Sequence, residues 1–337
     1  MAKPFVIPIF LPHSGCPHRC VFCNQTAITG NTEKFPTPDA LRAEIDRLMP
    51  YKRENRGKTE VSFYGGNFLG LSSEKIRMCL DTVACYADSN LIDGIRFSTR
   101  PDTITPENLK RIEGYPVSTI EIGVQSMAEN VLSLSKRGHS AAATRQAVPM
   151  LKQTSCQIGI QIMIGLPGDN EVAAALTARE IVGMAPDFVR IYPTLVIRGS
   201  RLARWYRQNR FVPLSINACV KRVKELYQLF TAHHITVIRM GLQATEGLSR
   251  GSVLAGPYHP SMGHMVLSEI MLDEAKKKLQ GLAGDHTEVS LRIHPKSFSR
   301  MQGLNRKNLT ELKKSFHLSR IHLVPDPNMA ELSVSVN

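Results

Sequence analysis

Three cysteines near the N-terminus have a spacing suited to metal chemistry. Cys16, Cys20 and Cys23 follow the pattern Cys-x3-Cys-x2-Cys. Cysteine thiolates bind iron–sulfur clusters, and a [4Fe–4S] cluster normally takes four thiolates, one for each iron. Three thiolates from one short segment leave one iron open to a ligand that is not a protein side chain. The spacing therefore predicts a [4Fe–4S] cluster with one open coordination position.

Two other interpretations of these cysteines compete with the cluster. Cys20 and Cys23 alone form a Cys-x-x-Cys pair, as in thioredoxin-like redox sites, but such a pair needs no third cysteine upstream. Zinc could be bound with His13 or His18 as fourth ligand, although structural zinc sites usually take a second ligand pair from farther along the chain. Zinc remains the main alternative. The remaining cysteines stand alone in apolar segments and are predicted to be buried thiols: Cys79, Cys85, Cys156 and Cys219.

The cysteine spacing, with Phe22 directly before the third cysteine, resembles the signature of the radical S-adenosylmethionine (SAM) superfamily. In that superfamily the amino and carboxylate groups of SAM chelate the open iron. An electron from the cluster then cleaves the sulfonium and generates a 5′-deoxyadenosyl radical. The resemblance implies both cofactors, a Phe22 contact with them, and an electron donor such as flavodoxin or ferredoxin.

Apolar strand-like segments alternate with amphipathic helical ones, a pattern typical of an α/β protein with a parallel sheet. Six strands are expected, at 5–10, 60–66, 94–100, 117–126, 157–168 and 187–196. Helices are expected at 38–49, 73–86, 105–112, 141–151 and 171–182. Six units match the partial (β/α)6, TIM-like barrel of the radical SAM type that the resemblance implies. In such barrels the active site lies at the C-terminal ends of the strands.

Two motifs follow the second and third expected strands. Gly65 and Gly66 allow close approach of a ligand to the backbone. The resemblance implies that this turn binds the SAM amino group, with Asn67 where the superfamily usually has an acid. Arg100 can hold a carboxylate with its two-pronged guanidinium, and its surroundings resemble the Glu-Thr-Arg-Pro-Asp run of the Elongator catalytic subunit. Ser98 stands at the Glu position. A plain Arg–Asp surface turn is the alternative.

Further candidates follow the fourth expected strand. Gln125 can donate and accept hydrogen bonds through its amide, and the resemblance implies contacts of Gln125 and Arg137 with the ribose or carboxylate of SAM. His139 is expected to be structural. Glu121 should point into the barrel because side chains alternate along a strand. A buried carboxylate there needs a partner, and Arg100 is the candidate.

Ile164 and Leu166, at the end of the fifth expected strand, are expected to contact the adenine of SAM. Tyr192 ends the sixth strand, and Tyr258 and His259 lie in a Gly- and Pro-rich loop that is expected to cover the barrel mouth. These three are candidate substrate contacts. No side chain is assigned a catalytic role.

The resemblance to the Elongator-like branch runs from about Pro4 to Thr194. Coproporphyrinogen dehydrogenase and its heme-chaperone relatives share the Gln–Arg pair, so an enzyme of that type is an alternative, as is a cluster- or heme-binding carrier without turnover. No acetyl-CoA loop is visible, and acetyl transfer in cis is not expected. Residues 1–200 are expected to form the core barrel, 201–285 an extension over its mouth, and 286–337 a small, basic α+β module. Within the extension, a strand is expected at 235–244 and the loop over the barrel mouth at 251–266.

The net charge of +13 predicts a polyanionic partner, with RNA favoured and a tRNA base as the possible site of modification. Arginines recur every third residue beside Trp205 and Tyr206, where they could follow a phosphate backbone. They are Arg198, Arg201, Arg204, Arg207 and Arg210. A small anionic metabolite is the alternative substrate, and a plain solvated helix face is the alternative interpretation of the arginines.

The seven cysteines are odd in number and unevenly spread, which does not suggest a disulfide framework. No leader peptide is expected before the cysteine motif. No run of 18 apolar residues predicts a membrane span. A cytoplasmic protein without membrane contact is therefore expected.

Overall fold

The computed structural model describes residues 4–30, 34–242, 251–282 and 286–336. Its main feature is a seven-stranded sheet in the order β1-β2-β3-β4-β5-β6-β8, with every neighbouring pair parallel. The strands are β1 (Phe5–Phe10), β2 (Thr59–Tyr64), β3 (Gly94–Thr99), β4 (Val117–Gln125), β5 (Gln157–Ile164), β6 (Phe188–Pro193) and β8 (Thr236–Met240). The sheet is an open half-barrel, so the predicted α/β partial barrel of the radical SAM type is confirmed.

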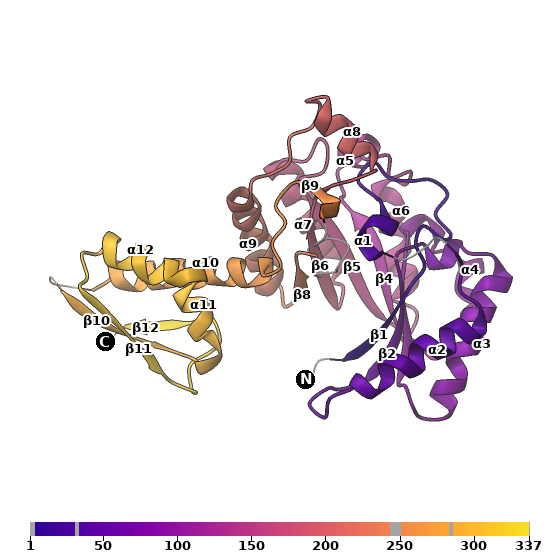
Figure 1. The fold of residues 1–337 in the computed structure, drawn as a ribbon, viewed down its shortest axis with the longest axis horizontal. Helices are drawn as coiled ribbons and strands as arrows, with labels where there is room; N and C mark the ends of the chain where they lie inside the picture. Colours follow the sequence, from indigo (N-terminus) through magenta and orange to yellow (C-terminus); the bar gives the residue numbers. More distant parts are fainter. Residues whose placement is uncertain (1–3, 31–33, 243–250, 283–285, 337) are drawn as a thin grey trace.

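Helices follow the strands and cover one face of the sheet (Figure 1). They are α2 (Pro38–Leu48), α3 (Ser73–Asp88), α4 (Pro106–Lys110), α6 (Ala141–Leu151), α7 (Glu171–Met184) and α9 (Ile216–Ala232). Several begin at a side chain that accepts a hydrogen bond from the first turn, for example Thr37, Ser72 and Asn170. Such caps satisfy backbone N–H groups that have no partner inside the helix.

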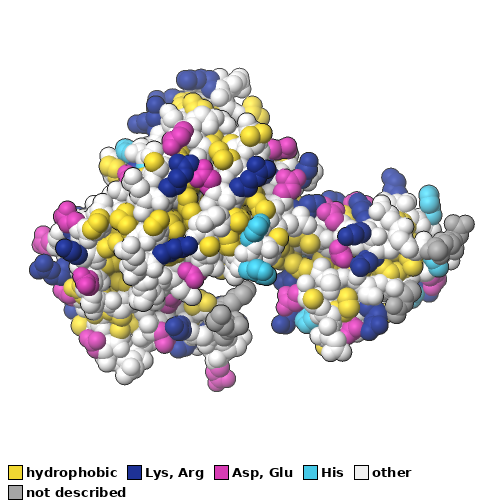
Figure 2. All heavy atoms as spheres, turned by 180° about the vertical axis from the view of Figure 1, so that it is seen from behind, with side chains coloured by type: hydrophobic (Ala, Val, Ile, Leu, Met, Phe, Trp, Pro, Cys, Tyr) yellow, Lys and Arg dark blue, Asp and Glu magenta, His cyan; other side chains and the backbone are white. Residues whose placement is uncertain are grey.

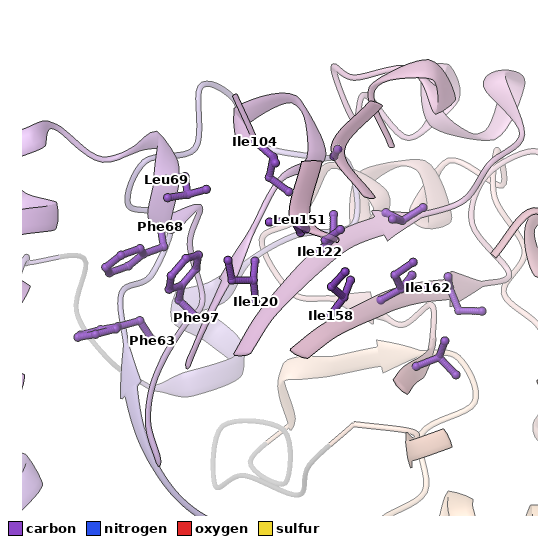
Figure 3. Packing of buried hydrophobic residues seen from close by; sticks show 14 of the residues in the cluster. Phe63, Phe68, Leu69, Phe97, Ile104, Ile120, Ile122, Leu151, Ile158 and Ile162 are labelled. Carbon is purple, nitrogen blue, oxygen red and sulfur yellow. The ribbon is translucent and has the colours of Figure 1, made fainter. Parts of the chain in front are cut away.

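The main core lies between the sheet and these helices. Figure 3 shows its aromatic part, where the rings of Phe63, Phe68 and Phe97 stack with centroid separations of 5.0 and 4.5 Å. On β4, Ile120 and Ile122 are wholly buried in this core. Because side chains alternate along a strand, their neighbours project from the opposite face, which we call the inner face.

The sheet has one more strand than the six expected for the barrel. A strand was expected at 235–244 as part of the extension; the structure pairs β8 with β6, and residues 243 and 244 lie outside the described residues. The helix before it, α9, buries Val220, Val223 and Phe230 in the main core. Together, α9 and β8 add one more helix–strand unit to the half-barrel.

Short elements lie beyond the C-terminal ends of the strands, at the top of Figure 1. They are α1 (Gln25–Thr29), α5 (Glu129–Leu134), α8 (Arg201–Arg207) and the antiparallel pair β7 (Val196–Ile197) and β9 (Val253–Ala255). The predicted active-site end of the sheet is thus the end covered by these short, irregular segments.

Single-turn 3-10 helices also occur along the chain, at Met49–Tyr51, Phe68–Gly70, Pro101–Thr103, Pro295–Ser297 and Leu304–Arg306.

The C-terminal part forms a separate lobe with its own core, visible at the left of Figure 1. It contains β10 (Glu288–Ile293), α11 (Phe298–Gln302), α12 (Lys307–Ser315), β11 (Arg320–Pro325) and β12 (Val334–Val336). Strand β10 is central, parallel to β11 and antiparallel to β12. The predicted small α+β extension is confirmed.

One helix joins the two cores, and its start corrects an expectation. Helix α10 (Met262–Gln280) contributes Met262 and Val266 to the main core and Met271 and Leu272 to the C-terminal core. The whole of 251–266 was expected to be a loop over the barrel mouth. Its last residues are instead helical, because they carry the first apolar positions of a long buried helix.

Two expectations about the rest of the chain can also be compared with the structure. Cys79 and Cys219 are buried as predicted, but Cys85 is exposed and Cys156 only half-buried. Both thiols bond to backbone carbonyls, Cys85 to Asp81 and Cys156 to Val117. Within the described residues, none of the helices combines the length and hydropathy needed to cross a membrane.

Candidate functional site

The three motif cysteines lie in the loop between β1 and α1, at the C-terminal end of the sheet. Cys20 is buried, and Cys16 and Cys23 are half-buried. Short backbone turns shape the loop: the amide of Cys16 donates to the carbonyl of His13 and that of Cys23 to the carbonyl of Cys20, both at 3.1 Å. The loop therefore presents its thiols from a fixed backbone.

The two glycines after β2 hold this loop in place. The Gly65 carbonyl accepts a hydrogen bond from the His13 amide at 3.0 Å, and Gly65 itself has a φ of +88°. A Cβ on Gly66 would lie 2.4 Å from the Ser14 carbonyl oxygen and 2.7 Å from that of Leu11. The turn thus needs glycine because the cysteine loop packs directly on its backbone. Its contact with SAM stays a prediction.

Replacing Gly66 by alanine should displace the cysteine loop, since both opposing atoms belong to backbone and cannot rotate away. We expect a loss of about 1–3 kcal/mol in the free energy of unfolding and reduced iron uptake. Thermal or urea denaturation and iron analysis would measure these effects. Gly183→Ala is the matched control: it lies in α7, and no described atom lies within 4 Å of the place its Cβ would take, so alanine there should stabilise by about 0.5–1 kcal/mol. Equal changes in stability and iron uptake in the two variants would contradict the view that the cysteine loop packs directly on Gly66.

Asn67 connects three segments of the site. Its side-chain oxygen accepts from the Thr99 hydroxyl (2.8 Å), the Thr103 hydroxyl (2.9 Å) and the Arg100 amide (3.0 Å). Its side-chain nitrogen donates to the Gly15 carbonyl at 2.9 Å. The side chain is wholly buried. A contact of Asn67 with SAM would therefore have to use its backbone, because the side-chain oxygen is already fully engaged.

Arg100 is committed to the protein. Its guanidinium makes a two-pronged ion pair with Asp102 at 2.7 and 2.9 Å, and a third nitrogen donates to the Arg137 carbonyl at 2.7 Å. The ion pair holds the pKa of Asp102 below its usual value, although burial works against this. The structure thus favours the Arg–Asp alternative, in a buried rather than a surface turn. Arg100 supports the segment that carries Arg137.

Arg137 reaches the cysteine loop itself. One guanidinium nitrogen lies 3.4 Å from Sγ of Cys20, and another donates to the Gly123 carbonyl at 2.6 Å. The third, Nε, is buried and has no hydrogen-bond partner in the described part of the chain. The backbone carbonyl of Arg137 also accepts from the ring of His18 at 2.9 Å. A positive charge therefore lies directly beside the thiols.

Gln125 has two features typical of a ligand-binding position. Its φ is +69°, in the left-handed region that non-glycine residues rarely occupy. Its side-chain oxygen is buried, and none of the described residues donates to it. A strained backbone and an unsatisfied polar atom cost free energy, and such features cluster where a ligand binds. Gln125 lies beside Arg137, since a Cβ on Gly123 would touch both side chains.

The thiols are close enough to influence one another. Burial, together with the neighbouring Cys20 and Cys16 thiols, raises the pKa of Cys23 to about 12. Burial also raises the pKa of Cys16, while the Arg137 guanidinium lowers it. No three His, Cys, Asp or Glu side chains in the described ranges converge as ligands of a metal ion. The three thiols with one adjacent guanidinium fit a cluster, in which each thiolate binds a different iron.

Of the two residues predicted to contact adenine, Leu166 lies near the cysteine loop and Ile164 lies on the helix side of the sheet. Leu166 is buried in a small cluster with Ala128, Val131 and Ala173, and Phe22 of the cysteine loop packs against that cluster. Ile164 is buried in the main core on the helix side of the sheet. The predicted side-chain contact of Ile164 with adenine is therefore not supported; the alternation along β5 turns its side chain away from the site.

Glu121 lies on the inner face as expected, but its predicted partner is wrong. Its carboxylate pairs with Arg190 from β6 at 2.7 Å and accepts from Gln161 of β5 at 2.8 Å and the Tyr64 hydroxyl of β2 at 3.3 Å. Arg100 is held elsewhere by Asp102. Tyr192 lies on the same face and interacts electrostatically with Arg190 and Glu121.

The other predicted substrate contacts lie near α1 and α10. Tyr258 packs against a small cluster with Leu195, Ile197 and Ile28, next to the end of the cysteine loop. His259 accepts from the Ser261 amide at 3.0 Å, just before α10. The structure brings Tyr258 near the site, whereas His259 shapes the start of a helix.

Several contacts in the site were not foreseen. The Val21 amide donates to the Ser135 carbonyl and the Val21 carbonyl accepts from the Leu202 amide, so α5 and α8 both hold the cysteine loop. Gly138 is required because a Cβ there would overlap the ring of His18. The inner-face residues Gln161 and Arg190 could have been found from polar residues alternating with apolar ones along the strands.

Comparison with known families identifies similarity over most of the chain. A model of the radical SAM superfamily matches residues 10–181, more than half of the chain. A model of the radical SAM C-terminal domain matches residues 186–271. The second match includes α9, β8 and the first half of α10.

Individual relatives are more distant. A tRNA uridine(34) acetyltransferase of Dehalococcoides mccartyi is 25% identical over 230 residues, covering 59% of this chain and 50% of the relative. Elongator complex protein 3 of Danio rerio is 27% identical over 261 residues, covering 65% and 47%. An uncharacterized protein of Methanocaldococcus jannaschii is 26% identical over 231 residues, covering 66% and 70%. The chain thus spans about half the length of the first two relatives.

Solved structures share the fold. The archaeal Elp3 of Methanocaldococcus infernus, with an N-terminal deletion, superposes with a TM-score of 0.63 at 21% identity, covering 82% of this chain and 64% of that one. Coproporphyrinogen III oxidase from Escherichia coli, described as a radical SAM enzyme, has a TM-score of 0.50 at 16% identity, covering 68% and 53%.

Proposed function

The chain belongs to the radical SAM superfamily of enzymes, and from that membership we propose that it cleaves SAM at a [4Fe–4S] cluster and modifies an anionic substrate, with a tRNA base favoured. Cys16, Cys20 and Cys23 would hold the cluster. Bound there, the cluster would supply the electron that cleaves SAM into methionine and a 5′-deoxyadenosyl radical. The supporting observation is the cysteine loop fixed at the C-terminal end of the sheet with the Arg137 guanidinium against Cys20.

The chain's own residues orient the cofactors and exclude water. The unpartnered atoms, Nε of Arg137 and the side-chain oxygen of Gln125, would bind SAM. The guanidinium of Arg137 also stabilises negative charge on the thiolates. Phe22 and Leu166 provide an apolar wall beside the loop. A flavodoxin or ferredoxin is the proposed electron donor.

Reductive SAM cleavage tests the activity. Protein reconstituted anaerobically with iron and sulfide, then given SAM and dithionite, should release 5′-deoxyadenosine. Absorption and electron paramagnetic resonance spectra report cluster assembly independently of turnover. An assembled cluster without any deoxyadenosine would favour a non-catalytic carrier, whereas bound zinc in place of iron would favour a zinc site.

The case for RNA comes from charge and position. The five arginines around α8 are all exposed, and in the described part of the chain none pairs with an acidic side chain. Arg210 lies 5.6 Å from the ring of Trp205. Figure 2 shows Lys and Arg side chains gathered at the top of the molecule, where α8 lies in Figure 1. The row of arginines along one helix is shorter than expected, because α8 spans only Arg201–Arg207.

The C-terminal lobe contributes less unpaired charge than its composition suggests. Arg292 pairs with Asp326, and Lys296 and Arg300 both pair with Glu331. Helix α8, in contrast, is attached to the cysteine loop through the Leu202 amide and the Val21 carbonyl at 2.8 Å. The basic surface that we propose for RNA is therefore the one around α8.

Neutralising two arginines of α8 should weaken tRNA binding. For Arg204→Gln with Arg207→Gln, we expect about tenfold weaker binding at low salt and a salt dependence of log K reduced by about one to two, since each phosphate contact releases counterions. Filter binding over a salt series measures both quantities. Arg53→Gln with Arg56→Gln is the charge-matched control, at exposed positions before β2 at the other end of the sheet. Equal losses in the two double variants would contradict a specific surface at α8.

A further inference from the structure

The inner face of the sheet carries a polar network that is separate from the cluster and SAM contacts described above. Its centre is Glu121, whose side chain is 0% exposed. The carboxylate binds side chains from four other strands: Tyr64 of β2, Gln161 of β5, Arg190 of β6 and, at 3.8 Å, Arg96 of β3. A wholly buried carboxylate with this many partners holds them in fixed positions.

The partners of Glu121 are themselves accessible. Tyr64, Gln161 and Arg190 are half-buried, as is Tyr192, which follows Arg190 on the same face of β6. Arg190 also donates to the Tyr64 hydroxyl at 3.3 Å, and its guanidinium lies 5.8 Å from the Tyr64 ring. Gln161 also donates to the Ser98 hydroxyl at 3.0 Å. The network thus presents a fixed set of polar and aromatic groups.

These groups lie on the same face as the proposed SAM contacts. Along β4, Glu121 and Gly123 alternate with the core residues Ile122 and Val124 and therefore lie on the inner face. The register shifts before Gln125, but its side-chain nitrogen would lie 3.0 Å from a Cβ on Gly123, so Gln125 reaches the same face. Gly123 is the position that Arg137 and Gln125 contact. Glu121 therefore lies on the inner face, four residues before Gln125 and two before Gly123, whose carbonyl accepts from Arg137.

The charges on this face are largely compensated. Glu121 compensates Arg190, and Arg96 lies between the two acids, 3.1 Å from Glu60 and 3.8 Å from Glu121. Arg239, the register neighbour of Arg190 on β8, has no acidic partner within the described ranges. The face therefore has little net charge but many donors and acceptors. Two tyrosine rings add surfaces on which a planar ring can stack.

We propose that Tyr64, Gln161, Arg190 and Tyr192 form the surface that binds the reacting part of the substrate, and that Glu121 is the residue that positions them. The chemistry fits an uncharged planar heterocycle with hydrogen-bond donors and acceptors. It does not fit a polycarboxylate, because Glu121 and Glu60 neutralise Arg190 and Arg96. Among the described arginines of this face, only Arg239 is left without an acidic partner. This proposal rests on the proposed function, since it takes the SAM site at the end of the same face as the place of reaction.

Two ring compounds that differ by one carboxylate, uracil and orotate, test this assignment. Their binding to the reconstituted, unreduced protein with SAM is measured by ligand-observed NMR. Glu121→Gln releases the charge of Arg190 while keeping the side-chain shape. It should raise the affinity of orotate relative to uracil by at least about tenfold, since even a charge about 10 Å away has that effect at an effective dielectric constant of about 20. Arg190→Gln should shift the same ratio in the opposite direction.

Glu180→Gln is the control, because it makes the same substitution in an ion pair, with Arg145, that joins α6 and α7 on the helix side of the sheet. It should leave the ratio unchanged. Tyr192→Phe serves if the Glu121 variant does not fold, and should weaken both probes by about fivefold, the value of one hydrogen bond, without changing their ratio. An unchanged ratio in both charge variants, an equal shift in Glu180→Gln, or no binding of either probe would overturn the proposal. Deoxyadenosine release in the same preparation shows separately whether the proposed function holds.

Discussion

Cys20→Ser should remove the iron–sulfur cluster. Cys20 is the buried thiol of the three and the one that Arg137 contacts at 3.4 Å. Even changes to residues that only support a metal ligand cost about 10–100-fold in metal affinity, so losing a direct ligand should cost more than about 100-fold. We expect iron and sulfide content, visible absorption and 5′-deoxyadenosine release to fall to background. Elemental analysis and spectroscopy measure the first effects independently of turnover.

The other cysteines provide a matched control. Cys85→Ser makes the same substitution at an exposed thiol on α3, away from the cysteine loop, and should retain the native iron content. Arg137→Lys separates charge from geometry. It keeps the positive charge but loses the guanidinium that contacts both Cys20 and the Gly123 carbonyl. A Cys20→Ser variant with native iron and sulfide content would exclude the proposed cluster ligation.

Asn67→Ala should produce the second large effect, on stability and on the cluster together. The substitution removes one acceptor for three donors and one donor for the Gly15 carbonyl, all in a buried position. Each buried polar group left without a partner costs about 1–3 kcal/mol, so we expect a loss of about 3–5 kcal/mol in the free energy of unfolding. Urea denaturation of the protein without the cluster measures this directly.

The same variant should bind less iron, because Asn67 ties the cysteine loop to the segment that carries Arg100. Asn55→Ala, in an exposed turn before β2, is the control and should change stability by less than about 0.5 kcal/mol. Native stability of the Asn67 variant would show that the hydrogen bonds of this side chain do not hold the site together.

The sequence was sufficient to predict the α/β architecture and six of the strands of the main sheet. The hydrophobic periods of strands and helices can be recognised in the sequence because they reflect which side chains each element buries. The helix predicted at 141–151, for example, is observed at Ala141–Leu151. The cysteine spacing predicted the family correctly, because a short loop determines which thiols can share a cluster. The family signature spans a few neighbouring residues, so it needs no long-range information.

Other features depended on contacts between distant segments. The apolar character of Ile164 predicted a cofactor contact, but the pleat of β5 directs its side chain into the main core. The start of α10 was expected to be a loop, since its Gly, Pro and His residues hid the apolar positions that two separate cores bury. Local composition cannot show which face of an element another element will cover.

The amino-acid sequence by itself determined the kind of chemistry, because three thiols within eight residues are close in any fold. Only the tertiary structure decided which polar residue serves which partner. Arg100 pairs with Asp102, Arg137 contacts Cys20, and Arg190 pairs with Glu121. These pairings depend on strand register and on side-chain direction at neighbouring strand ends, and both are set by packing across the whole sheet.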